Sequence, residues 1–350
     1  MQNHFTGLDG LVLLLYFLST MGIGFYFYRK SRSTEGFTAA SRSLPGWVCG
    51  LSIFATYLSS ISFLALPGKS YASNWSPFVF SLSVPIATWI AATVFLPYYR
   101  KSGEISAYAH LERRFGVWAR MYASFFYLLT QLARMGAVMY LMALPLSVLT
   151  GLDIKLIILI TGISVTLYSF VGGIVAVIWA DALQSVVLIV GAVTCSLIMF
   201  LNMPEGAGQT FSIASQYHKF SLGSFSASLT QETFWIILLY GIVINLQNFG
   251  IDQNYVQRYI ASKTDRDARK SVWLGGLLYV PVSALFFLIG TQLFSYYHVH
   301  KTQMNDLRHI IAAQQIKEKG LTPETPDYTA AVEQSALTLR EEDIGDKVFP

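Results

Sequence analysis

The sequence predicts an all-α membrane protein with about eight transmembrane helices, and three observations support this fold class. The 350-residue chain is 53% hydrophobic and only 13% charged, whereas a soluble domain is normally about a quarter charged. Its mean hydropathy is +0.48. Apolar runs recur along the chain, each near the roughly 20 residues that a helix needs to cross a bilayer. A soluble helix that is apolar all round would have no face for water.

The apolar runs define the expected spans. They cover about 8–28, 47–66, 78–98, 119–144, 155–171, 178–201, 233–256 and 272–296. The first run is long enough to span and no basic segment precedes it, so it does not have the pattern of a cleavable signal peptide. We therefore assign residues 1–296 to a transmembrane core and residues 297–350 to a polar loop or cap segment with helical patches.

Basic residues are unevenly shared among the loops, and this predicts the orientation. The loops after the first, third and seventh spans carry most of them; the last of these loops contains Arg258, Lys263, Arg266, Arg269 and Lys270. By the positive-inside rule these loops face the cytoplasm. The chain is then an integral protein of the cell membrane, the inner membrane in a bacterium. Its N-terminus and residues 297–350 lie on the outer side of that membrane. No basic stripe with interleaved aromatic residues indicates nucleic-acid binding.

The second span is rich in hydroxyl groups near its middle. They belong to Ser52, Thr56, Ser59, Ser60 and Ser62. Ser52, Thr56 and Ser59 fall on one helical face. A single hydroxyl commonly bonds back to the preceding turn or to a neighbouring helix. Five within eleven residues suit a locally unwound helix whose carbonyls and hydroxyls face an ion or solute.

Arg134 lies inside the fourth span, on a face that it shares with Tyr127, Thr130 and Gln131. An arginine at mid-membrane costs at least ~2.5–3.5 kcal/mol on insertion scales, so it needs a partner or a water-filled cavity. Two interpretations stay open. Arg134 forms a structural salt bridge with an acidic residue, Asp181 or Asp252, or it donates two hydrogen bonds to a solute carboxylate.

The sixth span places Asp181, Gln184 and Ser185 together at positions i, i+3 and i+4. A carboxylate in the membrane needs compensation. Three interpretations stay open for Asp181. It binds a hard cation, which prefers oxygen ligands, it acts in a proton relay, or it pairs with Arg134.

A polar stripe runs along the seventh span. Its members are Gly241, Asn245, Asn248, Asp252, Tyr255 and Tyr259. Amide side chains both donate and accept hydrogen bonds, which suits a polyhydroxylated or zwitterionic solute. We therefore expect Asn245 and Asn248 to contact the solute, whereas Asp252 fits the cytoplasmic end of a helix better.

Three segments together resemble the sodium:solute symporter family. They read "SIFATYLSSISFLALPGKSYASNW", "GGIVAVIWADALQ" and "DQNYVQRY", and with the eight-span pattern the resemblance covers about residues 5–300. Within this family, the chain resembles the bacterial sialic acid symporters. The resemblance implies the leucine-transporter-type fold of two inverted five-helix repeats. Span 1 would be an extra helix, spans 2–6 the first repeat, and spans 7 and 8 the start of the second.

The resemblance also implies roles for individual residues. The carbonyls of Ala55 and Leu58 match half of the principal sodium site, and Asp181 matches a carboxylate that holds an additional sodium in some members. The substrate-contacting positions match Ser59, Ser60, Ser62, Arg134 and Asn245. Two substrate positions depart from the pattern expected for sialic acid: Tyr57 replaces a small hydroxyl residue, and Ser81 replaces a glutamine.

These inferences predict a sodium-coupled secondary symporter that imports a small polar or anionic organic solute, sialic acid or sugar-like, by alternating access. Sodium would be the coupling ion and lipid the surrounding solvent. The family pattern places the hydroxyl-rich helix that completes the sodium site after residue 350, so we expect the chain to be a fragment. The alternative is a solute-binding membrane sensor or a truncated, non-transporting homologue. An intramembrane enzyme is disfavoured because the histidines lie outside the spans.

Overall fold

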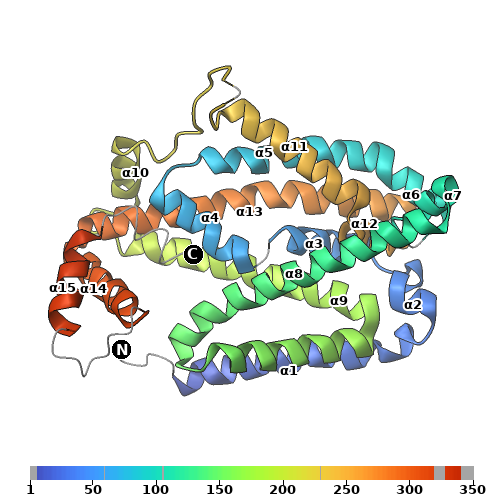
Figure 1. Cartoon of the computed structure of the whole chain (residues 1–350), viewed down its shortest axis with the longest axis horizontal. Coiled ribbons are helices and arrows are strands. Elements are labelled where there is room, and N and C mark those ends of the chain that lie inside the picture. Colours follow the sequence, from blue (N-terminus) through green and yellow to red (C-terminus); the bar gives the residue numbers. More distant parts are fainter. Residues whose placement is uncertain (1–5, 59, 105, 229, 319–327, 340–350) are drawn as a thin grey trace. The chain divides into compact units, whose positions relative to one another are not determined.

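The computed structural model describes residues 6–58, 60–104, 106–228, 230–318 and 328–339, and helices form their regular secondary structure (Figure 1). The first eight α-helices are α1 (Gly7–Phe27), α2 (Thr34–Ala39), α3 (Gly46–Tyr57), α4 (Ser60–Ala72), α5 (Val79–Ile90), α6 (Leu96–Ser102), α7 (Ala109–Phe115) and α8 (Val117–Thr150). The others are α9 (Ile154–Leu201), α10 (Ala207–Gln216), α11 (Phe234–Ile251), α12 (Gln253–Ile260), α13 (Asp265–Val299), α14 (Lys301–Glu318) and α15 (Tyr328–Thr338).

Helix α9 is 48 residues long, but its backbone leaves the helical conformation at Gly173, where φ is 58° and ψ is −161°. Only glycine adopts this conformation without strain, and a Cβ there would lie 3.0 Å from side-chain atoms of Phe37 and Ser31. The glycine divides α9 into two arms, 154–172 and 174–201. These arms correspond to the predicted fifth and sixth spans.

Six helices of the described residues are long and apolar enough to cross a membrane, and the count is seven if the bent pair α3 and α4 is taken as one span. Counting the two arms of α9 separately gives eight apolar segments among the described residues. Apolar side chains of α1 and α8 are largely uncovered: only 11% and 6% of their most apolar windows are buried. Such surfaces are unfavourable in water and favourable in lipid.

The chain divides into two compact units. The first contains residues 1–61, 83–188 and 240–280, and the second contains residues 62–82, 189–239 and 281–350. In the first unit, α3 packs closely against the start of α13. A Cβ added to Gly46 would lie 2.5 Å from the carbonyl oxygen of Asp267, and one added to Gly275 would lie 2.9 Å from that of Gly50. Small residues at such positions allow helix backbones to approach closely, as in membrane bundles.

In the second unit, polar anchors join the segments around Trp75. Trp75 Nε1 donates to Thr291 Oγ1 at 2.9 Å, and Ser70 Oγ donates to the carbonyl of Phe287 at 2.6 Å. The Lys219 ammonium is buried, donates to the Tyr71 carbonyl at 2.6 Å and lies 3.8 Å from the centre of the Phe294 ring. Helices α14 and α15 pack on the same core through an apolar cluster. The polar segment after the last span therefore contains two helices, α14 and α15, that pack on the core of the second unit.

Candidate functional site

The central polar contact of the first unit joins Asp181 on α9 to Arg258 on α12. Arg258 Nη2 donates to Asp181 Oδ2 at 2.8 Å, and Ser52 Oγ on α3 donates to the same oxygen at 2.6 Å. Arg258 Nε also donates to Ser52 Oγ at 2.7 Å. These three side chains form a closed network that links α3, α9 and α12.

The network is withdrawn from water. The side chains of Arg258 and Asp181 are 10% and 16% exposed, and a buried ion pair is tolerated only while each charge keeps its partners. Arg258 Nη1 donates to the carbonyl of Asn254 at 2.5 Å. Asp181 Oδ1 accepts no hydrogen bond from the described part of the chain. The network therefore uses only one of the two carboxylate oxygens of Asp181.

A second hydroxyl fixes the position of α9 against α3. Ser185 is buried one turn after Asp181, and its Oγ lies 3.0 Å from the carbonyl oxygen of Leu51 and 2.8 Å from that of Asp181. Asp181 and Ser185, which the sequence places on one helical face, thus both contact α3. The hydrogen bond from Ser185 to Leu51 fixes the position of Asp181 along the axis of α3.

The ion pairs of the described residues bear on one of the two interpretations of Arg134, the structural salt bridge. Asp181 pairs with Arg258, whereas Asp252 caps α12 by accepting from the Asn254 backbone N–H at 2.8 Å and from the Tyr127 hydroxyl at 3.0 Å. Among the described residues Arg134 forms no ion pair, and its side chain is exposed on α8. Pairing of Arg134 with either carboxylate is therefore not observed in the described part of the chain.

Sequence reasoning missed Arg258 as a site residue. The charge count places Arg258 among the basic residues of the loop after span 7, but Arg258 is only 8% exposed and so is not part of a solvated loop. The available signal was the "DQNYVQRY" segment, in which Arg258 follows Asn254 by four residues on one helical face. Charge counting treats every arginine near a span end alike, and for that reason it misplaced this one.

The second span breaks where the hydroxyl pattern predicts. Helix α3 ends at Tyr57, and Leu58 has extended backbone with φ −96° and ψ 99°. The Leu58 N–H donates to the Phe54 carbonyl at 3.2 Å. Carbonyls of a terminal turn lack helical donors, and Ala55 and Leu58 lie in and just after this turn. Thr56 Oγ1 donates to the Ser52 carbonyl at 2.8 Å. This hydroxyl therefore bonds back to the preceding turn of its own helix.

Two predicted solute residues of the first unit are packed inside it. The Tyr57 ring centre lies 4.9 Å from that of Tyr255 and 4.9 Å from that of Tyr279. Asn245 is fully buried, and its Nδ2 donates to Ser83 Oγ at 2.9 Å. Asn245 Oδ1 has no hydrogen-bond partner among the described residues. The structure therefore holds both side chains in packed surroundings and leaves one buried acceptor of Asn245 without a partner among the described residues.

The remaining predicted residues lie elsewhere or outside the described residues. Ser81 belongs to the second unit, is buried, and its Oγ lies 2.7 Å from Ser283 Oγ. Ser62 also belongs to the second unit and is half-buried. Ser60 begins α4, and Ser59 lies outside the described residues. Asn248, one turn after Asn245, is half-buried on α11.

The chain is similar to known proteins in family, sequence and structure. The model of the "Sodium:solute symporter family" matches residues 37–321. The chain is 34% identical over 300 residues to a sodium/sialic acid symporter of Aliivibrio fischeri, covering 84% of this chain and 59% of that protein. It is 32% identical over 302 residues to a sodium/sialic acid symporter of Proteus mirabilis, covering 85% and 60%. The chain thus spans about three-fifths of the length of these relatives.

A solved structure is similar over nearly the whole chain. It is described as the substrate-bound outward-open state of a Na⁺-coupled sialic acid symporter with a novel Na⁺ site. Its TM-score is 0.80 at 26% identity, covering 97% of this chain and 68% of that chain. This similarity confirms the predicted all-α membrane fold of the leucine-transporter type.

Proposed function

The chain belongs to the sodium:solute symporter family, and from this membership we propose that the protein imports a small polar or anionic organic solute together with sodium by alternating access. The observation that carries the proposal is the combination of a broken span at Leu58 with a buried carboxylate, Asp181, that keeps one free oxygen. Oxygen ligands of these two kinds suit a hard cation. The family is one of transporters and not of enzymes.

The proposed solute is sialic acid or a related sugar acid. Two relatives above 30% identity are named as sodium/sialic acid symporters, and Arg134 offers an exposed guanidinium without an ion pair in the described ranges. A guanidinium binds a carboxylate through two parallel hydrogen bonds. The hydroxyls of Ser59 and Ser60 in span 2 and the amides of Asn245 and Asn248 would bind the sugar hydroxyls, with Tyr57 shaping the remaining contacts.

Sodium would bind at the break in span 2, through the carbonyls of Ala55 and Leu58. A second sodium at Asp181 would use Oδ1, because Oδ2 already accepts hydrogen bonds from Ser52 and Arg258. Each ion that crosses ~100 mV releases about 2.3 kcal/mol, and a tenfold sodium gradient adds about 1.4 kcal/mol. The sum of about 3.7 kcal/mol per ion supports a roughly 500-fold solute gradient.

The proposed setting is the cell membrane, the inner membrane in a bacterium, with the N-terminus outside. The uncovered apolar faces of α1 and α8 support contact with lipid. The basic loops support the orientation. In this orientation residues 297–350, including α14 and α15, lie on the outer side.

Ligand binding tests the proposal before transport is measured. Sialic acids, neutral sugars and monocarboxylates should be screened by thermal unfolding of the purified protein, in sodium and in potassium at equal ionic strength. We expect a sialic acid at 100 times its Kd to stabilise the protein by about 2.7 kcal/mol, and its Kd to be lower in sodium. Equal affinity in the two cations would contradict sodium coupling, and binding of neutral sugars alone would contradict the carboxylate role of Arg134.

A further inference from the structure

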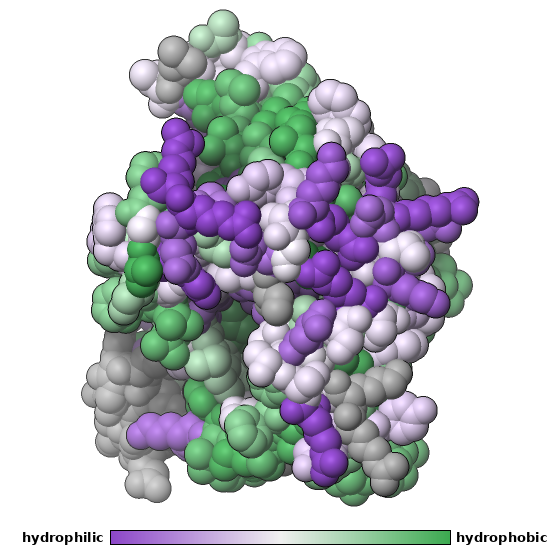
Figure 2. Space-filling model, turned by 90° about the vertical axis from the view of Figure 1, so that its right-hand side faces the viewer, coloured by the Kyte–Doolittle hydropathy of each residue, from purple (hydrophilic) through white to green (hydrophobic). Residues whose placement is uncertain are grey.

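The end of the first unit that carries α2, α6 and α7 is strongly polar. Figure 2 views the molecule from this side, and hydrophilic residues gather across the face between two hydrophobic surfaces. Among the described residues of this unit, an open pocket of about 490 Å³ lies between the first turns of α3 and α13; it is lined by Trp47, Arg266, Arg269, Lys270, Trp273 and Leu274. Nothing in the proposed transport cycle uses this pocket.

The α13 members of the pocket share one helical face. Positions 266, 269, 270, 273 and 274 follow the spacing i, i+3, i+4, i+7 and i+8, which places them along a single stripe. The order along the stripe is three cations, then an indole, then leucine. Leu277 continues it and is 47% exposed. The stripe therefore changes from charged to apolar over about two helical turns.

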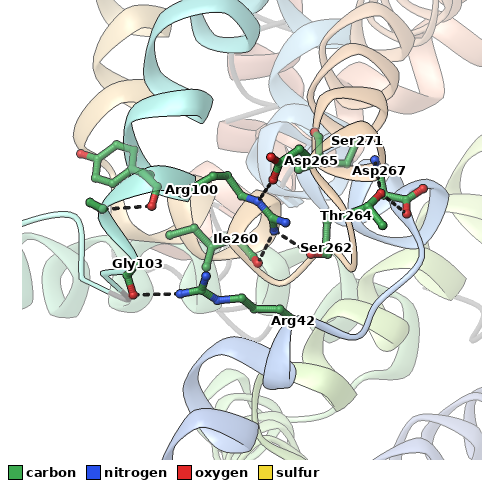
Figure 3. Close-up of polar contacts among 12 residues, drawn as sticks. Arg42, Arg100, Gly103, Ile260, Ser262, Thr264, Asp265, Asp267 and Ser271 are labelled. Carbon is green, nitrogen blue, oxygen red and sulfur yellow. Dashed lines mark hydrogen bonds and ion pairs between the residues drawn. The ribbon is translucent and has the colours of Figure 1, made fainter.

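The pocket cations are not neutralised by the acidic residues beside them. Asp265 is held by Arg100, whose Nε donates to its Oδ1 at 2.6 Å. Asp267 accepts from the Thr264 hydroxyl at 2.7 Å (Figure 3). In the described part of the chain, no carboxylate forms an ion pair with Arg266, Arg269 or Lys270. All three cations are exposed, so they are accessible to an anion from outside the chain.

Packing and hydrogen bonds fix the backbone segments around the pocket. Gly46 packs against the backbone of Asp267, and this contact leaves no room for a side chain. The next residue, Trp47, is 54% exposed, and its ring meets Trp179 edge-on at 5.6 Å between centres. Arg100 also donates to the carbonyl of Ser262 at 2.7 Å, which fixes the segment before α13 (Figure 3). A preformed pocket avoids the ordering cost of binding.

We propose that this pocket binds the phosphate headgroup of an anionic phospholipid of the cytoplasmic leaflet. Guanidinium groups bind phosphate oxygens through two hydrogen bonds, and basic pockets between membrane helices bind anionic headgroups. Tryptophan is enriched at the depth of the headgroups. The sequence from cations through Trp273 to Leu274 and Leu277 follows that of a lipid, from phosphate through glycerol to acyl chain. A free phosphate would use only the first part of this stripe.

Native mass spectrometry with lipid titration tests the proposal on the full-length protein. Phosphatidylglycerol and phosphatidylcholine with identical acyl chains should be compared, and glycerol 3-phosphate should be included as a soluble anion. We expect wild-type protein to retain phosphatidylglycerol preferentially. The triple variant Arg266→Gln/Arg269→Gln/Lys270→Gln should bind it at least about tenfold more weakly. Glycerol 3-phosphate should not displace the lipid at equal concentration.

A matched control separates this site from general surface charge. The variant Arg32→Gln/Lys101→Gln/Arg114→Gln removes three exposed cations from other basic loops of the same unit, and its affinity for phosphatidylglycerol should stay at the wild-type value. Equal loss in both triple variants would overturn the proposal, as would equal retention of the two lipids or displacement by glycerol 3-phosphate. If the pocket triple variant does not fold, the single Arg269→Gln variant provides the same comparison against Arg114→Gln.

Discussion

Replacing Arg258 with alanine should destabilise the protein by about 3–5 kcal/mol, because it leaves the buried Asp181 carboxylate without its counter-charge. Arg258 Nη2 lies 2.8 Å from Asp181 Oδ2, and both side chains are at most 16% exposed. A matched control is Arg120→Ala, since Arg120 pairs with Glu112 at 2.7 Å but the two side chains are 46% and 38% exposed. An exposed pair of this kind contributes about 0–1 kcal/mol. Unfolding in detergent measures both losses.

A double variant identifies the cause of the Arg258 effect. Arg258→Ala/Asp181→Ala removes the uncompensated charge, so it should be more stable than Arg258→Ala alone. Sodium should stabilise Arg258→Ala more than wild type if the cation binds Asp181, because the ion then replaces the lost guanidinium charge. The account of a buried pair fails if Arg258→Ala costs no more than Arg120→Ala, or if the double variant is no better than the single one.

Replacing Arg134 with alanine should weaken binding of a carboxylated solute at least about 30-fold, which corresponds to about 2 kcal/mol. The guanidinium has no protein carboxylate as partner among the described residues and is exposed, so the stability of the unliganded protein should change by less than about 1 kcal/mol. Arg134→Lys should recover only part of the affinity, because an ammonium lacks the planar fork.

Isothermal titration with sialic acid and with a neutral analogue of the same ring measures the Arg134 effect. The neutral analogue should lose little affinity in Arg134→Ala, because it has no carboxylate to bind. Unchanged affinity for the acid would remove Arg134 from the solute site. Equal losses for the acid and the neutral analogue would instead indicate a structural role.

The apolar segments and their interruptions could be predicted from sequence because they depend on local properties. Run length placed the helices, and the density of hydroxyls around Thr56 indicated the break that occurs after Tyr57. Polar spacing brought Asp181 and Ser185 to one face, and both contact α3. These features need only helical periodicity and the cost of polar groups in an apolar environment.

The partner of Asp181 could not be predicted in the same way. Arg258 lies 77 residues away, and the contact depends on how α12 packs against α3 and α9. An arginine just beyond an apolar run has the same local pattern whether it is solvated or buried. The packing of Tyr57 among Tyr255 and Tyr279 is likewise a long-range result. Local patterns therefore identified which residues are chemically costly, and only the fold showed which of them satisfy one another.

Uptake of radiolabelled sialic acid into proteoliposomes tests the central claim most directly. The full-length protein should be reconstituted with an inward sodium gradient and a negative interior potential, and compared with the same vesicles in equal sodium or in potassium. We predict accumulation above the external concentration only with the sodium gradient, and loss of that accumulation in Arg134→Ala. Uptake at an undiminished rate without sodium, or tight sialic acid binding without any uptake, would contradict sodium-coupled symport.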